Sequence, residues 1–228
     1  MEHQDNLNFL KEAYNGTKGL INYGELCSWY FCGEARTIDV CAHRAYRDFC
    51  RRLTGIGKVN AQEKKKWRDA EESMIAGEIE RLLDHSAVTE KTFDNWHEAL
   101  CTQIMKNAEP LCLQGSFTLG LAQKWVNMTF KYMIIMEQWD EKLKGVMSCL
   151  HVPVDRYIME AAAEDCQVDV LYTNGTYGPY REGKATPWSQ WEYGEYIEFQ
   201  KAIRAKEPCP IAWESRAWLE VAKKRKKK

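Results

Sequence analysis

The segment Phe117–Met136 is apolar on almost every side when drawn as a helix, and few folds accommodate such an element. Its apolar residues are spread around the helix rather than confined to one stripe: Leu119, Leu121, Trp125, Val126, Met128, Phe130, Tyr132, Met133, Ile134, Ile135 and Met136. A helix that is hydrophobic all round lies in the middle of its domain. The chain has no run of 18 apolar residues, so this segment is not expected to span a membrane.

Apolar residues recur at helical spacing along the rest of the chain and predict an all-α fold with at most one short strand. The 228 residues fit one domain, which we expect to span residues 1–222 as a compact multi-helix unit around the central buried helix. The other expected elements are helices over Asn6–Tyr14, Ile38–Leu53, Asn60–Leu83, Thr89–Glu109, Arg156–Glu164, Ser189–Lys206 and Trp213–Lys223, and a strand at Val168–Tyr172.

The net charge of −1 conceals an uneven distribution. The last six residues, Lys223–Lys228, are all basic, and without them 26 basic residues face 33 acidic ones. A like-charged run cannot bury its side chains, so we expect residues 223–228 to form a disordered basic tail. The acidic remainder does not favour a general phosphate-binding surface, so a nucleic-acid contact would come from a local patch or from the tail. The tail fits an electrostatic anchor and a plain solvated end equally well.

Nine cysteines occur mostly inside apolar helical patterns, and no two have Cys-x-x-Cys spacing. This usage predicts reduced core thiols rather than a disulfide framework or a zinc site. The amino terminus, Met1–Asp5, is polar and acidic, unlike a signal peptide. We therefore expect a cytoplasmic protein that has no membrane partner and needs neither a metal nor a cofactor.

The chain lacks three motifs that carry common chemistries. It has no Gly-x-x-x-x-Gly-Lys-Ser/Thr loop, no Gly-x-Ser-x-Gly elbow and no His-Glu-x-x-His pair. Nucleotide hydrolysis at a phosphate-binding loop, serine esterase activity and zinc proteolysis are therefore disfavoured.

Lys124 lies within the apolar segment and shares a helical row with Phe117, Leu121, Met128 and Ile135. Apolar surroundings disfavour the charged ammonium, which would make the amine usable as a nucleophile. The competing interpretation is that the side chain packs its stem and extends its charged end to the surface.

Asp155 follows Pro153-Val154 and precedes a predicted helix, which is the position of an N-cap. Capping alone accounts for an aspartate here. The functional interpretation is a carboxylate held rigidly at a helix start, where it could stabilise a developing cation or activate an attacking group.

The pair Lys124 and Pro153-Val154-Asp155 resembles the helix-hairpin-helix DNA glycosylases over Gly115–Glu164, and the 31-residue spacing is most similar to their archaeal 8-oxoguanine branch. The resemblance implies that Lys124 attacks the sugar C1′ and forms a Schiff base. It also implies that Asp155 supports departure of the base. DNA would be the partner, and Arg156 is a candidate DNA contact.

The family's Gly-x-Gly hairpin does not precede Lys124 but occurs at Leu53–Lys58. Gly55, Gly57 and Lys58 are therefore candidate contacts to the DNA backbone, since such a turn directs backbone N–H groups at a phosphate. An ordinary glycine turn that ends a helix explains the same string.

Aromatic residues are abundant, with nine tryptophans and eleven tyrosines. A flipped base is gripped between such rings, so Trp125, Trp188, Trp191 and His151 are candidates for a base pocket. Core packing at helical spacing is the competing and simpler explanation of the tryptophans, and a lone histidine is more often a structural hydrogen-bonding residue than a ligand.

The sequence thus favours a DNA glycosylase, with or without lyase activity, that excises a damaged or modified base in DNA repair or in antiviral defence. Two alternatives remain open: a non-catalytic helical interaction protein, phage- or defence-related, and a protein that binds a small nucleotide-like ligand. The feature that discriminates between them is whether Lys124 and Asp155 converge on one water-reachable pocket.

Overall fold

Helix α6 (Leu119–Met136) is the axis of the fold, and all of its residues are buried. The structure is a computed structural model that describes residues 3–14, 22–33, 35–50, 53, 60–85, 87–111 and 117–226. Helix α6 packs most extensively against α3 (Ile38–Phe49) and next against α5 (Glu90–Ala108). The described residues are mainly helical and include one small two-stranded sheet, which confirms the prediction of an all-α fold around a central buried helix.

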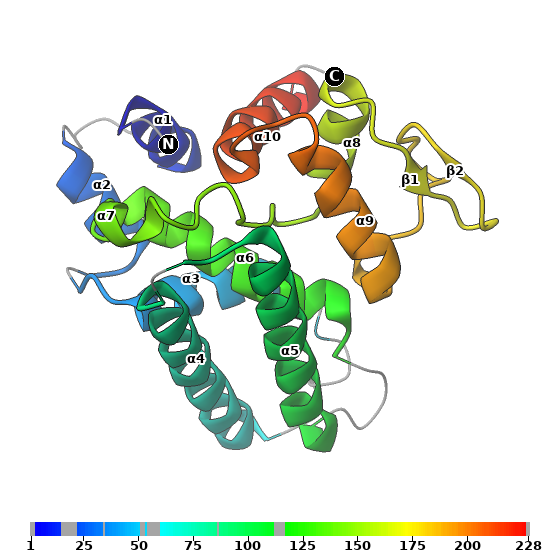
Figure 1. Cartoon of the computed structure of the whole chain (residues 1–228). Coiled ribbons are helices and arrows are strands. Elements are labelled where there is room, and N and C mark those ends of the chain that lie inside the picture. Colours follow the sequence, from blue (N-terminus) through cyan, green and yellow to red (C-terminus); the bar gives the residue numbers. More distant parts are fainter. Residues whose placement is uncertain are drawn as a thin grey trace.

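The remaining elements surround α6 (Figure 1). Helices α4 and α5 lie side by side as a long pair below it, whereas α1 and α10 lie together on its opposite side. The bounds are α1 His3–Tyr14, α2 Tyr23–Tyr30, α4 Ala61–Leu83, the 3-10 helix η3 Glu109–Leu111, α7 Asp140–Leu143, α8 Arg156–Asp165, the 3-10 helix η4 Trp188–Gln190, α9 Tyr193–Arg204 and α10 Pro210–Lys226.

The sheet is a small antiparallel hairpin. Strand β1 (Val170–Leu171) lies within the strand expected at Val168–Tyr172, and it pairs with β2 (Tyr177–Gly178), which was expected to be loop. Val170 lies opposite Gly178, and Leu171 lies opposite Tyr177.

The aromatic core explains why α6 is fixed in place. Trp125 is fully buried and contacts the rings of Tyr46, Phe49, Trp67 and Phe117. Its indole N–H donates to the carbonyl of Ala42 at 2.8 Å, so α3 and α6 are joined by a directed bond as well as by apolar contact.

Polar residues on α6 hold the chain that leads to Asp155. The side chain of Gln123 contacts the N–H and carbonyl of Val154, each at 3.4 Å. Asn127 donates to the carbonyl of Val152 at 3.2 Å, and Gln200 of α9 bonds both backbone groups of Val152 at 2.9 Å. Because buried backbone groups require partners, these amides fix the irregular segment in one position.

The end of the chain differs from the sequence expectation. Residues 223–226 form the last turn of α10 instead of part of a disordered tail. Lys224 pairs with Glu164 at 2.6 Å and Arg225 with Glu160 at 2.9 Å, so carboxylates of α8 neutralise the charges that were expected to repel one another. In the described part of the chain, no helix combines the length and apolar character needed to cross a membrane.

Candidate functional site

Asp155 is the N-cap of α8, as predicted. Its Oδ1 accepts the backbone N–H of Tyr157 at 2.9 Å and that of Ile158 at 3.1 Å. These bonds satisfy two donors at the helix start and fix the orientation of the carboxylate. The other oxygen, Oδ2, is left for side-chain partners.

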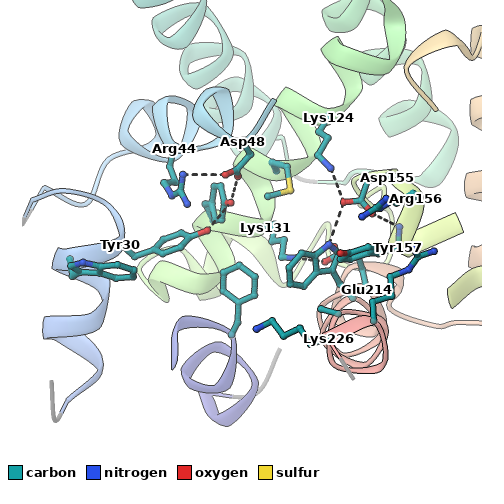
Figure 2. A pocket seen from close by; sticks show the side chains of 17 residues that line it. Tyr30, Arg44, Asp48, Lys124, Lys131, Asp155, Arg156, Tyr157, Glu214 and Lys226 are labelled. Atoms are coloured by element: carbon teal, nitrogen blue, oxygen red, sulfur yellow. Dashed lines mark hydrogen bonds and ion pairs between the residues drawn. The ribbon is translucent and has the colours of Figure 1, made fainter. Parts of the chain in front are cut away.

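Lys124 and Asp155 meet in a pocket (Figure 2). The Nζ atom of Lys124 donates to Oδ2 of Asp155 at 2.8 Å, and the two side chains are 9% and 21% exposed. The ammonium also lies 5.1 Å from the centre of the Trp188 ring, within cation–π range. Lys124 therefore does not extend to the surface, as the competing interpretation required.

The pocket has a volume of about 750 Å³ and combines aromatic walls with charged groups. Six aromatic, six basic and three acidic side chains line it, together with Met128 and Ala222: Phe9, Trp29, Tyr30, Tyr132, Tyr157 and Trp218; Arg44, Lys124, Lys131, Arg156, Arg225 and Lys226; Asp48, Asp155 and Glu214. Its wall is basic although the chain carries a net charge of −1.

The charge state of Asp155 follows from opposing effects. Burial raises the pKa of this carboxyl, but the Lys124 ammonium and the hydrogen bonds outweigh it, so the pKa lies below the ordinary value. Asp155 is therefore an anion at neutral pH. An anion fixed at this position can stabilise positive charge that develops on a bound ligand.

The opposite end of the pocket holds a second set of paired groups. Lys124 and Tyr132 are eight residues apart on one face of α6, so the pocket runs along the helix for about 12 Å. At the Tyr132 end, Arg44 pairs with Asp48 at 3.1 Å and lies 4.2 Å above the ring of Tyr30. The hydroxyl of Tyr132 donates to Asp48 and lies 2.9 Å from that of Tyr30.

Between these ends, Lys131 and Glu214 form an ion pair that is almost fully enclosed. Their closest atoms are 2.8 Å apart, and the side chains are 2% and 1% exposed. Lys131 is seven residues from Lys124, so helical spacing places both amines on the same face of α6. That spacing is the sequence signal by which Lys131 could have been found; no comparable signal marks Glu214, Trp218, Arg44 or Asp48.

The candidates for the base pocket are split by the structure. Trp188 contacts Lys124, and Arg156, a candidate DNA contact rather than a base-pocket residue, lines the pocket. Trp125 instead lies in the aromatic core, and Trp191 packs on Phe199 and donates to the carbonyl of Thr186. The candidate hairpin residues Gly55, Gly57 and Lys58 lie outside the described residues.

His151 belongs to a separate buried network rather than to the pocket. Its two ring nitrogens lie 2.8 Å from the hydroxyl of Tyr196 and 2.8 Å from Asp94. Arg204 donates to the other oxygen of Asp94 at 2.8 Å, and His97 lies 4.6 Å away, centre to centre, from the His151 ring. His151 therefore does not line this pocket, because long-range contacts hold its ring in the protein interior.

Comparisons with protein-family models, with curated proteins and with solved structures found no match. The functional argument therefore depends on the geometry of the pocket and on the residues that line it.

Proposed function

We propose that this chain is a DNA N-glycosylase that excises a damaged or modified base, with Lys124 as the nucleophile and Asp155 as its electrostatic partner. The observation that supports the proposal is the 2.8 Å contact between these two groups inside a pocket that both line. A pocket of about 750 Å³ lies within the size range typical of small-ligand sites, so a flipped nucleotide can be accommodated.

The chemistry requires an amine, an anion and a leaving base. Lys124 releases a proton to water, and the neutral amine then forms a bond to C1′ as the bond between C1′ and the base breaks. Asp155 keeps its negative charge during this step. The base leaves with the bonding electron pair and takes up a proton, and the anionic site stabilises the positive charge that develops on the sugar. Opening of the sugar ring gives a Schiff base, which water hydrolyses.

The lining fits a nucleotide better than an uncharged ligand. Aromatic side chains offer flat surfaces on which a base stacks, and Trp29, which is 45% exposed, lies at this pocket. Arg156 and Lys226 add positive charge from α8 and α10, which a phosphate backbone requires. The arrangement is also consistent with the roles implied by the resemblance to helix-hairpin-helix glycosylases.

Borohydride trapping tests the nucleophile directly. Duplex oligonucleotides that each carry one candidate base, such as 8-oxoguanine, uracil or hypoxanthine, are incubated with the protein and reduced. We expect one duplex to give a covalent adduct that Lys124→Ala abolishes. The matched control is Lys142→Ala. Lys142 pairs with Asp84 on the surface at 2.9 Å, close to the 2.8 Å between Lys124 and Asp155. Base release that persists without an adduct and survives Lys124→Ala would refute the role of Lys124.

Pocket size also favours a second candidate, a protein that binds a small nucleotide-like ligand. Titration calorimetry separates the two candidates. Saturable binding of free nucleotides, with no affinity for duplex or single-stranded DNA, would favour the ligand-binding protein over the glycosylase.

A further inference from the structure

Trp218 of α10 connects the two lysine–carboxylate pairs of the pocket. Its indole N–H donates to Oδ2 of Asp155 at 3.3 Å, the same oxygen that accepts Lys124. The ammonium of Lys131 lies 5.7 Å from the centre of the Trp218 ring and 4.8 Å from that of Phe9. Trp218 is therefore held from one side by a cation and directed on the other side at an anion.

The Lys131–Glu214 pair holds this arrangement in place. An enclosed ion pair is seldom retained for stability alone, because removing two charges from water offsets much of their attraction. Here both oxygens of Glu214 lie within 2.9 Å of the Lys131 amine, which cannot leave without stranding a buried carboxylate. The amine is consequently a fixed charge beneath the Trp218 ring.

The contact between Trp218 and Asp155 becomes important when Lys124 turns towards a substrate. The strongest side-chain partner of Asp155 is then lost, and burial favours protonation of the carboxyl. The indole N–H and the two backbone N–H groups of α8 remain as donors. Lys131 also contributes to the field that favours the anion.

We propose that Trp218, held by the Lys131–Glu214 pair, is a positioning residue that keeps Asp155 ionised and directed into the pocket after Lys124 leaves it. This inference rests on the proposed function for its role in catalysis, whereas its effect on Asp155 can be measured without any substrate.

Several other charged or titratable groups share the pocket with Asp155 and define the field that acts on it. They are Lys124, Lys131 and Tyr132 of α6, Arg156 and Tyr157 of α8, Glu214, Arg225 and Lys226 of α10, Arg44 and Asp48 of α3, and Tyr30 of α2. A test must therefore change the Trp218 N–H without altering these charges.

The substitution Trp218→Phe meets this requirement, because it keeps a ring over Lys131 and removes the donor. The titration of Asp155 is followed by ¹³C NMR of its carboxyl carbon, assigned with Asp155→Asn. We expect the Asp155 midpoint to rise by about one pH unit in Trp218→Phe, as for the loss of one hydrogen bond to a charged group. Trp213→Phe is the matched control, since Trp213 donates to Asp165 at 3.2 Å between the same two helices, outside the pocket.

A second readout links the titration to reactivity. An oligonucleotide with an abasic site presents an aldehyde that Lys124 can trap under borohydride. Trapping is measured as a function of pH. We expect the acidic limb of this pH profile to shift to higher pH by the same amount in Trp218→Phe and to stay in place in Trp213→Phe. If Trp218→Phe does not fold, Trp218→Met replaces it, because methionine fills the space flexibly, lacks the N–H donor and leaves the charged groups of the pocket in place. It should raise the Asp155 midpoint too.

The outcomes separate the two proposals. An Asp155 midpoint that is the same in Trp218→Phe, or in Trp218→Met, as in wild type overturns the role of Trp218, even if trapping at Lys124 succeeds. A shifted midpoint without any adduct in the wild-type protein supports the positioning role and counts against the glycosylase.

Discussion

Gly120 of α6 lies directly against the backbone of Ser189 in η4. A Cβ atom at position 120 would lie 2.5 Å from the Ser189 Cα and 2.5 Å from the carbonyl oxygen of Trp188. Only glycine permits this approach, since backbone cannot move aside as a flexible side chain can. The contact places the Trp188 ring next to Lys124, one turn further along α6.

The substitution Gly120→Ala should therefore destabilise the protein by about 1–3 kcal/mol, because η4 must shift away from α6. Urea denaturation measures the effect. The matched control is Gly77→Ala in α4, where a Cβ would meet only the end of the Arg81 side chain at 3.7 Å. That change should be neutral or stabilising by about 0.5–1 kcal/mol. Equal effects of the two substitutions would contradict the close packing at Gly120.

Breaking the Lys131–Glu214 pair from one side should be costly. We expect Lys131→Met or Glu214→Leu alone to lower the free energy of unfolding by roughly 3–5 kcal/mol, because each leaves one uncompensated buried charge. The double variant should recover most of the loss. On the surface, breaking the Lys142–Asp84 pair with Lys142→Ala should change stability by less than about 1 kcal/mol. A double variant no more stable than the single ones would contradict this account.

Asp155 has two roles that substitution can separate. Asparagine is as good an N-cap as aspartate, so Asp155→Asn should keep α8 capped while removing the anion. Asp155→Ala should cost about 1 kcal/mol more, since it also loses the cap. Both variants should lose trapping of an abasic-site oligonucleotide. Stability is measured by urea denaturation at neutral pH. If Asp155→Asn traps the abasic-site oligonucleotide as fully as wild type does, the negative charge of Asp155 is not needed.

Stability should fall on acidification below about pH 6.5. Burial lowers the pKa of His151 to about 4, although its bond to Asp94 acts in the opposite direction. Burial also lowers the pKa of His97. In the unfolded chain both rings regain their ordinary pKa values. On acidification they therefore bind protons at a higher pH in the unfolded state than in the folded state. The stability that His151 contributes is present above pH 6.5 and is lost as the pH falls towards 4.

The size of this loss is about 3 kcal/mol for His151, from the linkage between a pKa shift and folding. The pKa of Asp94 is lowered to about 2, so Asp94 adds a further loss of stability as the pH falls below 3.8, the ordinary pKa of the group. Denaturation curves between pH 4 and 7.5 measure the effect, and His151→Gln should flatten the dependence. His85→Gln, the same substitution at an exposed histidine, is the matched control.

Local sequence signals predicted much of the fold. The end of α6 at Met136 and the capping role of Asp155 follow from helical spacing and from the position after Pro153. Helix α2 was missed, although Asn22 and Glu25 form a capping box that the sequence contains. Three glycines in residues 16–24 masked that signal, since they suggested an interruption rather than a helix start.

The candidate site was predicted only in part, for a geometric reason. Trp125 follows Lys124 in the chain, but successive residues of a helix point about 100° apart, so it faces the core rather than the pocket. Glu214 and Trp218 come from a helix almost a hundred residues later. Their contacts with α6 depend on tertiary packing, which no local pattern in a single sequence encodes.

The pocket takes Phe9 from α1 and Trp218 from α10, the first and last helices that the structure describes. A ribosome delivers a chain from its amino end, so Lys124 and Lys131 emerge before their partners Asp155 and Glu214 have been made. Until then the most apolar helix of the nascent chain carries two cations without the carboxylates that neutralise them. Final packing of α6 must therefore wait until α10 has been synthesised, and chains arrested before α10 should remain targets for chaperones and proteases.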